Sequence, residues 1–152
     1  MKRSKRASSK GFTLPEVLVA ALVTIIAFVG ILFTYARFIE LDEIARNTSI
    51  VLQAAQNKVE SIKNTAYAQI VATFDNQTFT VAGITNTGGV VTIDDTNPKL
   101  MIVTVTVCWK QTNNRLIGED TNLNGALNAG EDTNGNGVLD SPVQLVAYIY
   151  NE

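Results

Sequence analysis

The stretch Lys10-Gly11-Phe12-Thr13-Leu14-Pro15-Glu16 stands directly before an apolar run, VLVAALVTIIAFVGILF, which fills residues 17–33. Thr24 is the only polar residue of that run, and residues 1–10 hold five basic side chains and no acidic one. Glu16 therefore places a single carboxylate at the entrance of an apolar helix. An ionisable side chain is costly in a membrane helix, and there it indicates a function by default.

The apolar run predicts a helix that crosses a membrane. A helix over residues 17–36 would be about 30 Å long, which matches the hydrocarbon thickness of a bilayer. The basic leader predicts a cytoplasmic N-terminus and places everything after Arg37 on the far side. No small-residue cleavage site follows Phe33, so we expect the helix to be retained rather than removed with a secretory signal.

Residues 11–16, Gly-Phe-Thr-Leu-Pro-Glu, resemble the processing site of type IV prepilins and type II secretion pseudopilins. The resemblance implies cleavage by a prepilin peptidase between Gly11 and Phe12 and N-methylation of Phe12. It implies that Glu16, the fifth mature residue, takes part in assembly with other pilin or pseudopilin subunits. It also implies a single-pass protein of the bacterial inner membrane, which later joins a filament in the periplasm or at the cell surface. Pro15 departs from the family pattern, but proline is tolerated in the first turn of a helix.

A physical argument leads to the same role for Glu16. A carboxylate in lipid is costly, but the cationic N-terminus of a neighbouring subunit would compensate its charge. Glu16 would then set the axial register of subunits that pack helix against helix. A plain signal anchor with an interfacial glutamate is the simpler alternative.

The resemblance implies a leader that is cleaved off (1–11). Composition divides the remainder into a transmembrane half-helix (12–36), an amphipathic half-helix (37–65) and a small β domain (66–152). The amphipathic half carries a predicted buried stripe whose spacing alternates between four and three residues. Its members are Leu41, Ala45, Thr48, Leu52, Ala55, Val59 and Ile62. We therefore expect one helix of about fifty residues that ends near Asn64-Thr65, because the helical pattern of the apolar run continues without a break into the amphipathic half.

Four segments of the β domain predict strands: residues 77–82, 90–93, 100–110 and 143–150. In residues 100–110, the alternation places Val103, Val105, Val107 and Trp109 on the inner face, and we expect Cys108, on the other face, to be partly exposed. An antiparallel sheet packed on the helix would bury both apolar faces. The predicted fold class is α+β of the type IV pilin kind.

Residues 119–142 contain a twelve-residue tandem repeat, EDTNLNGALNAG followed by EDTNGNGVLDSP. Each copy resembles the calcium loop of EF-hands, in which oxygens at positions one, three, five, seven, nine and twelve hold the ion and glycine at six makes the turn. The first copy fills all six positions, with Gly125 at the turn. Its predicted ligands are Asp120, Asn122, Asn124, the carbonyl of Ala126, Asn128 and Glu131.

The second copy has Gly137 at the turn but Val143 at position twelve, so its closing carboxylate is missing. Its predicted ligands are Asp132, Asn134, Asn136, the carbonyl of Val138 and Asp140. Water, Glu119 or another segment would have to complete this loop. We expect one or two Ca²⁺ ions, bound weakly and for a structural purpose, in a loop flanked by strands rather than helices. A flexible Asn/Gly-rich loop is the alternative.

Composition disfavours other functions. The chain has no histidine and one cysteine, which removes the commonest general base and excludes a disulfide within the chain. Residues 119–152 hold six acidic side chains and no basic one, so nucleic-acid binding is not expected. We expect a structural subunit rather than an enzyme. The segments 16–20, 55–60 and 103–109 resemble minor pilins of the V type most. A minor pseudopilin of type II secretion, a membrane-anchored calcium module that never polymerises, and a receptor at a fibre tip are the alternatives.

Overall fold

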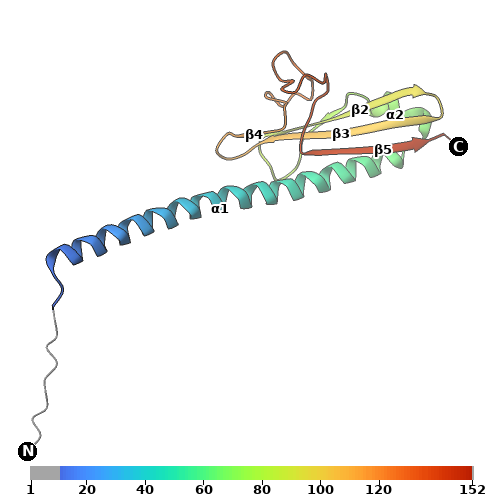
Figure 1. The fold of residues 1–152 in the computed structure, drawn as a ribbon. Helices are drawn as coiled ribbons and strands as arrows, with labels where there is room; N and C mark the ends of the chain where they lie inside the picture. Colours follow the sequence, from blue (N-terminus) through green and yellow to red (C-terminus); the bar gives the residue numbers. More distant parts are fainter. Residues whose placement is uncertain (1–10, 152) are drawn as a thin grey trace, which may run out of the picture. The chain divides into compact units, whose positions relative to one another are not determined.

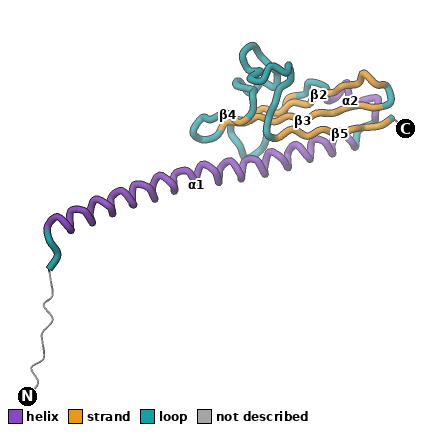
Figure 2. Tube along the Cα trace, viewed as in Figure 1, coloured by secondary structure: helices purple, strands orange, loops and turns teal. Residues whose placement is uncertain are grey.

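The computed structural model describes residues 11–151, so the predictions for the basic leader lie outside the described residues. The chain forms two compact units, one up to Leu41 and the other Asp42–Glu152, and each is described by itself. The fold class is α+β, with one long N-terminal helix and a small antiparallel sheet (Figures 1 and 2). The elements are α1 (Leu14–Lys63), α2 (Tyr67–Phe74), β1 (Thr78–Phe79), β2 (Thr87–Asn97), β3 (Leu100–Lys110), β4 (Leu116–Ile117) and β5 (Val143–Tyr150).

Helix α1 has the predicted length of 50 residues. It begins after Thr13, whose carbonyl accepts the main-chain N–H of Glu16 at 3.0 Å and of Val17 at 3.2 Å. In the first unit its apolar side chains are exposed. For example, Val17 is 57% exposed and Phe38 is 64% exposed. The Thr24 hydroxyl donates to the carbonyl of Ala20 at 2.8 Å, so its polar group is satisfied within the helix. This part of α1 is long and apolar enough to cross a membrane.

In the second unit, α1 buries a different stripe from the predicted one. The fully covered positions are Asn47, Val51, Ala55 and Ile62, whereas Leu52 is 38% exposed. Leu41, which belongs to the first unit, is 59% exposed. The prediction was wrong for Leu41, Ala45 and Leu52, which are exposed, and correct for Ala55 and Ile62. Asn47, Val51 and Ala55 lie four residues apart, so they share one face of the helix.

Strand β3 is the centre of the sheet. It pairs antiparallel with β2 along one edge, with Val91 opposite Val105, and with β5 along the other, with Val105 opposite Leu145 (Figure 1). The short β4 extends that second edge by pairing with Trp109 and Lys110. The predicted bounds of β3 and β5 are confirmed, and β2 is longer than predicted.

Two features of residues 66–82 differ from the prediction. Residues 67–74 form α2, and only Thr78 and Phe79 of the predicted strand 77–82 join the sheet. Ile70 and Phe74 of α2 are buried, four residues apart on one face. Asn76 adopts a positive φ of 56°, a conformation in which asparagine is favoured, and this residue separates the helix from the strand.

The core lies between the sheet and the C-terminal part of α1. Val103, Val105, Val107 and Trp109 are all 0% exposed, which confirms the predicted inner face of β3. Lys58 of α1 contacts α2 and the β1 segment at the edge of this core. Its Nζ lies 5.3 Å from the centre of the Phe74 ring and 5.1 Å from that of Phe79 and donates to Gln77 Oε1 at 2.6 Å. Partial burial lowers the pKa of Lys58.

The opposite face of β3 is also covered, and here the prediction for Cys108 was wrong. Cys108 is 0% exposed and Thr106 is 3% exposed. Residues between β4 and β5 fold over this face, and the Cys108 thiol lies 3.8 Å from the carbonyl oxygen of Asp140. Alternation along a strand assigns a residue to a face, but it does not say which loop covers that face.

Candidate functional site

The repeat lies in one long excursion, residues 118–142, between β4 and β5. No helix flanks it within the described residues, as predicted, and Ile117 and Val143 are strand residues. The excursion therefore differs in its flanks from a helix-loop-helix calcium sensor.

The first loop is organised by side-chain oxygens that accept main-chain N–H groups. Asp120 is 0% exposed. Its two carboxylate oxygens accept from Asn124 N at 3.1 Å and Gly125 N at 2.7 Å. Asn122 Oδ1 accepts from Asn124 N at 3.0 Å, and Asn124 Oδ1 accepts from Ala126 N at 2.8 Å. The predicted ligands at positions one, three and five are thereby brought to the inside of one tight turn.

The second loop repeats this pattern twelve residues later. Asp132 accepts from Asn136 N at 3.2 Å and, through its other oxygen, from Gly137 N at 2.8 Å. Asn134 Oδ1 accepts from Asn136 N at 3.0 Å, and Asn136 Oδ1 accepts from Val138 N at 2.8 Å. Hydrogen bonds from main-chain N–H groups, that of Gly137 first, hold the pKa of Asp132 below its ordinary value.

The two loops share backbone conformation as well as hydrogen bonds. Position six has a positive φ in both, 78° at Gly125 and 74° at Gly137. Position four also has a positive φ in both, 60° at Leu123 and 74° at Gly135. Leu123 adopts a conformation that an L-residue with a bulky side chain rarely takes. The duplicated sequence therefore folds into a duplicated structure, even where the first copy lacks the glycine.

Each loop is closed by a glutamate that precedes an aspartate. Glu131 accepts from Thr121 N at 2.9 Å and from Asn128 N at 2.8 Å, which are positions two and nine of the first loop. Glu119 accepts from Thr133 N at 3.1 Å and from Asp140 N at 3.2 Å, the same positions of the second loop. Of the three alternatives for completing the second loop, Glu119 is the one whose carboxylate lies there.

The first loop is docked on the sheet, whereas the second is open. A Cβ added to Gly88 of β2 would lie 2.6 Å from the carbonyl oxygen of Leu123, and one added to Gly125 would lie 2.7 Å from Thr78 Cγ2. At Gly135 and Gly137 nothing lies within 4 Å. The absence of side chains at Gly88 and Gly125 is therefore what allows the first loop to approach β1 and β2.

The oxygens of these loops suit a hard cation by type. Carboxylates, side-chain amides and main-chain carbonyls are the ligands that calcium prefers. Each loop draws mostly on amides and carbonyls, and among residues 11–151 no group of three or more His, Cys, Asp or Glu side chains is placed to hold a metal. Asn128, predicted as a ligand, donates its Nδ2 to the carbonyl of Ala126 at 3.2 Å.

The N-terminal motif lies at the start of α1. Gly11, Phe12 and Thr13 precede the helix and are exposed, with Phe12 at 83%. Glu16 lies in the first turn, and its Oε2 accepts the Thr13 N–H over a long contact of 3.5 Å. This is the reach-back of a capping box, S/T-x-x-E. Glu16 therefore has a local role in capping the helix, in addition to the role in assembly that the resemblance implies.

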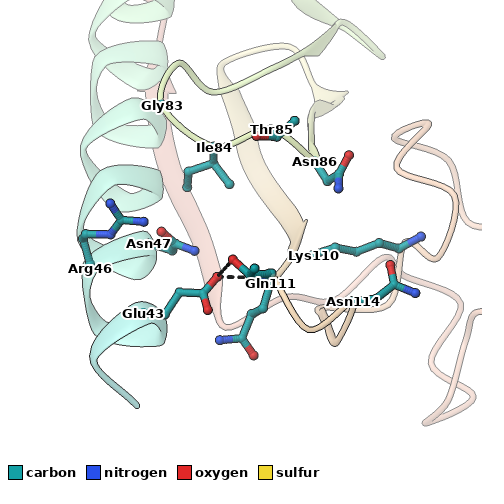
Figure 3. Close-up of a pocket in the computed structure, with 11 residues that line it drawn as sticks. Glu43, Arg46, Asn47, Gly83, Ile84, Thr85, Asn86, Lys110, Gln111 and Asn114 are labelled. Atoms are coloured by element: carbon teal, nitrogen blue, oxygen red, sulfur yellow. Dashed lines mark hydrogen bonds between the residues drawn. The ribbon is translucent and has the colours of Figure 1, made fainter. Parts of the chain in front are cut away.

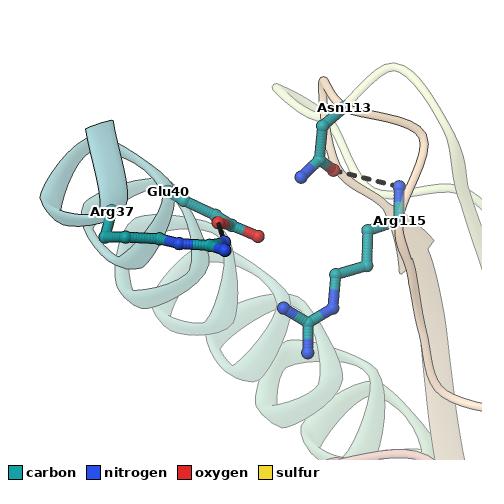
Figure 4. A network of polar contacts seen from close by, with 4 residues as sticks. All are labelled: Arg37, Glu40, Asn113 and Arg115. Atoms are coloured by element: carbon teal, nitrogen blue, oxygen red, sulfur yellow. Dashed lines mark hydrogen bonds and ion pairs between the residues drawn. The ribbon is translucent and has the colours of Figure 1, made fainter. Parts of the chain in front are cut away.

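Two polar contacts are drawn in Figure 4. In the first unit, Arg37 forms an ion pair with Glu40 at 2.9 Å, with its side chain 64% exposed, so the pair contributes little stability. In the second unit, Asn113 Oδ1 accepts the main-chain N–H of Arg115 at 3.0 Å and shapes the turn between β3 and β4.

Sequence reasoning did not find a polar pocket of about 350 Å³ in the second unit (Figure 3). Residues of α1, of the loop before β2 and of the turn after β3 line it, among them Asn47, Ile84 and Gln111. The sequence signal for this pocket is Asn47, a polar residue on the same buried face of the helix as Val51 and Ala55.

Compared with protein-family models, with curated proteins and with solved structures, the chain matches none of them.

Proposed function

We propose that the chain is a structural subunit of a type IV pilin-like filament, a minor pilin that is held in the inner membrane, cut by prepilin peptidase and assembled by helix packing. The observation that carries the proposal is the processing motif at residues 11–16 followed by a helical segment whose apolar side chains are left uncovered by the described residues. The large apolar side chains from Val17 to Ile39 are each more than half exposed. Lipid before assembly and neighbouring helices after it would bury them.

The position of the motif supports processing. Gly11 and Phe12 lie in non-helical, exposed backbone directly ahead of Leu14, where α1 begins. A peptidase needs an extended segment that can enter its active site, and such a segment is more accessible than a helix. The minor pseudopilin of a type II secretion system shares every one of these features, so it remains the alternative filament.

The mature N-terminus tests this proposal. Mass spectrometry of the protein from its native membrane should find N-methylated Phe12 as the first residue. An intact N-terminus at Met1 would overturn the filament proposal and favour an uncut membrane anchor. Loss of the cut in a strain without prepilin peptidase is the matched control.

The role of Glu16 is tested by two substitutions that separate charge from capping. Glu16→Gln keeps an oxygen for the Thr13 N–H but removes the negative charge, whereas Glu16→Ala removes both. If Glu16 pairs with the N-terminal amine of a neighbour, both variants should be processed and then fail to enter filaments. Normal assembly of the Gln variant would contradict charge pairing and leave the cap as the role of Glu16.

A second proposal concerns residues 119–142, which we assign to structural calcium binding. The reciprocal contacts of Glu119 and Glu131 support it, because they give each loop a carboxylate at its first and closing positions. Bound calcium would close an excursion whose ordering otherwise costs entropy. Calorimetry of the full chain in detergent micelles at millimolar calcium should show heat and a raised Tm. The absence of both would exclude the calcium role, and magnesium serves as the control because it demands stricter octahedral geometry.

A further inference from the structure

Four neutral carboxamides are among the residues that line the pocket of Figure 3, which lies within the second unit. Asn47 comes from α1, Asn86 from the loop before β2, and Gln111 and Asn114 from the turn after β3. The main-chain N–H of Lys110 donates to the carbonyl of Asn86 at 2.9 Å, and that of Asn114 to the carbonyl of Gln111 at 2.8 Å. The backbone that carries these side chains is therefore fixed by hydrogen bonds.

Two of these carboxamides are buried without a partner. Asn47 is 3% exposed and Gln111 is 2% exposed. Asn47 Oδ1 and both amide atoms of Gln111 have no hydrogen-bond partner among the described residues. Buried polar atoms are nearly always paired, and an unpaired one costs free energy. Three such atoms in one pocket point to a group that enters it and pairs with them.

Three charged side chains, those of Glu43, Arg46 and Lys110, also line the pocket. Glu43 Oε1 accepts from the main-chain N and the hydroxyl of Thr112, both at 2.8 Å. The side chains of Arg46 and Lys110 extend away from the middle of the pocket (Figure 3). The unpaired atoms of Asn47 and Gln111 belong to uncharged groups, so a neutral group is their natural complement.

The hydrogen-bonding capacity of the unpaired atoms identifies the complementary group. They are two acceptors, Asn47 Oδ1 and Gln111 Oε1, and one donor, Gln111 Nε2. A primary carboxamide offers two donors on its nitrogen and an acceptor on its oxygen. A sugar also carries both kinds of group, but none of the residues that line this pocket is aromatic, so the apolar face of a sugar ring would have nothing to stack on.

We propose that this pocket binds the side-chain carboxamide of an asparagine or glutamine presented by another polypeptide. The proposal does not depend on cleavage of the leader or on calcium. The probe is N-acetyl-asparagine N-methylamide, whose only primary carboxamide is the side chain, titrated into the full chain in detergent micelles and followed by the side-chain NH₂ signals of Asn47 and Gln111. We expect saturable shifts of both signals, with a dissociation constant on the order of millimolar for so small a ligand.

Two further probes and two variants make the outcome decisive. The N-methylamides of N-acetyl-aspartate and N-acetyl-leucine keep the size and the secondary main-chain amides but lack a primary carboxamide, so neither should produce the shifts. Gln111→Leu should abolish binding of the asparagine probe without lowering Tm, because it removes unpaired polar atoms. Gln56→Leu, at an exposed carboxamide of α1, should leave binding unchanged. Equal shifts with all three probes, no shift with any, or binding that survives Gln111→Leu would overturn the proposal.

Discussion

Glu119 contacts the second loop at the same two main-chain positions at which Glu131 contacts the first. Glu131 bonds Thr121 N and Asn128 N, and Glu119 bonds Thr133 N and Asp140 N. Both glutamates are buried, at 9% exposure for Glu119 and 6% for Glu131. The carboxylate that the second repeat lacks at its own end is therefore contributed by the first residue of the first repeat.

The calcium proposal predicts that each glutamate serves a different ion. A carboxylate oxygen that accepts one N–H retains a lone pair for a metal, and affinity in such loops rises with the number of charged ligands. Glu131→Gln should weaken the first site and Glu119→Gln the second, each by about tenfold or more, which corresponds to about 1.4 kcal/mol. Calorimetric titration of the full chain measures both sites. Glu60→Gln, on an exposed turn of α1, is the control. Unchanged calcium affinity at both sites of the Glu119→Gln variant would refute the role of Glu119.

Replacing the glycine at position six of each loop tests how far the stability of the first loop depends on its contact with the sheet. Gly125→Ala and Gly137→Ala each force an alanine into a positive φ, at a cost of about 1 kcal/mol. Only Gly125 lies against the sheet, where a new Cβ would meet Thr78 at 2.7 Å and Val90 at 3.1 Å. Gly125→Ala should therefore lower the free energy of unfolding by about 1–3 kcal/mol more than Gly137→Ala. Denaturant unfolding followed by the fluorescence of Trp109 measures the difference, and equal losses would show that the first loop is not held by this contact.

The buried thiol predicts a stability that declines in alkali. Burial, first among the causes, raises the pKa of Cys108 above its ordinary value of 9.0. Below the ordinary value both the folded and the unfolded chain keep the proton, so the stabilising effect is fully present. As pH rises from about 9 toward the folded pKa, the unfolded chain ionises first and the free energy of unfolding falls, by up to about 1.4 kcal/mol per pH unit.

Cys108→Ala isolates this effect from the titration of lysines and tyrosines in the same range. The wild type should lose more stability than the variant between pH 8 and pH 10, measured by denaturant unfolding under reducing conditions. A thiol reagent at neutral pH should modify Cys108 only as fast as the loop opens, and fast modification of the folded chain would contradict the burial of the thiol.

Lys58 predicts an energetic coupling between α1 and the β1 segment. A cation within about 6 Å of an aromatic ring is stabilised by about 0.5–2 kcal/mol, and more when desolvated. A double-mutant cycle with Lys58→Met and Phe79→Leu should yield a coupling energy in that range, from unfolding measurements on four proteins. The same cycle with Lys63→Met, at an exposed position of α1, should be additive. Additivity in the Lys58 cycle would show that the ring contact carries no net energy.

The elements whose pattern is strong and regular were predictable. The bounds of β3 and β5 and the length of α1 followed from alternation and from an unbroken helical pattern. The buried face of α1 was not predictable in detail, because Leu52 and Val51 are both apolar and only the sheet decides which of them is covered. Helix α2 escaped notice because eight residues are too few for a distinctive period.

The candidate sites divide in the same way. The ligand positions of each loop follow from local spacing, and the structure places their oxygens on the inside of two equivalent turns. The contribution of Glu119 to the second loop depends on how two copies of the repeat fold against each other, which no single copy encodes. Asn47 and Gln111 lie 64 positions apart in the sequence, and they share a pocket only because β3 returns the chain to α1.

The pairing of β3 sets an order in which the sheet can be made. Its partner β2 is joined to it by a tight turn at Pro98 and Lys99, so β2 and β3 can pair as soon as residues 87–110 have been made. Its other edge stays unpaired until β5 is present, and β5 follows only after the excursion 118–142. Until then, Leu100–Val107 present an unpaired apolar strand edge, the kind of edge on which chains aggregate. A chain that ended within the excursion would lack β5 and leave this edge unpaired, so the excursion has to be completed before the second unit can close its sheet.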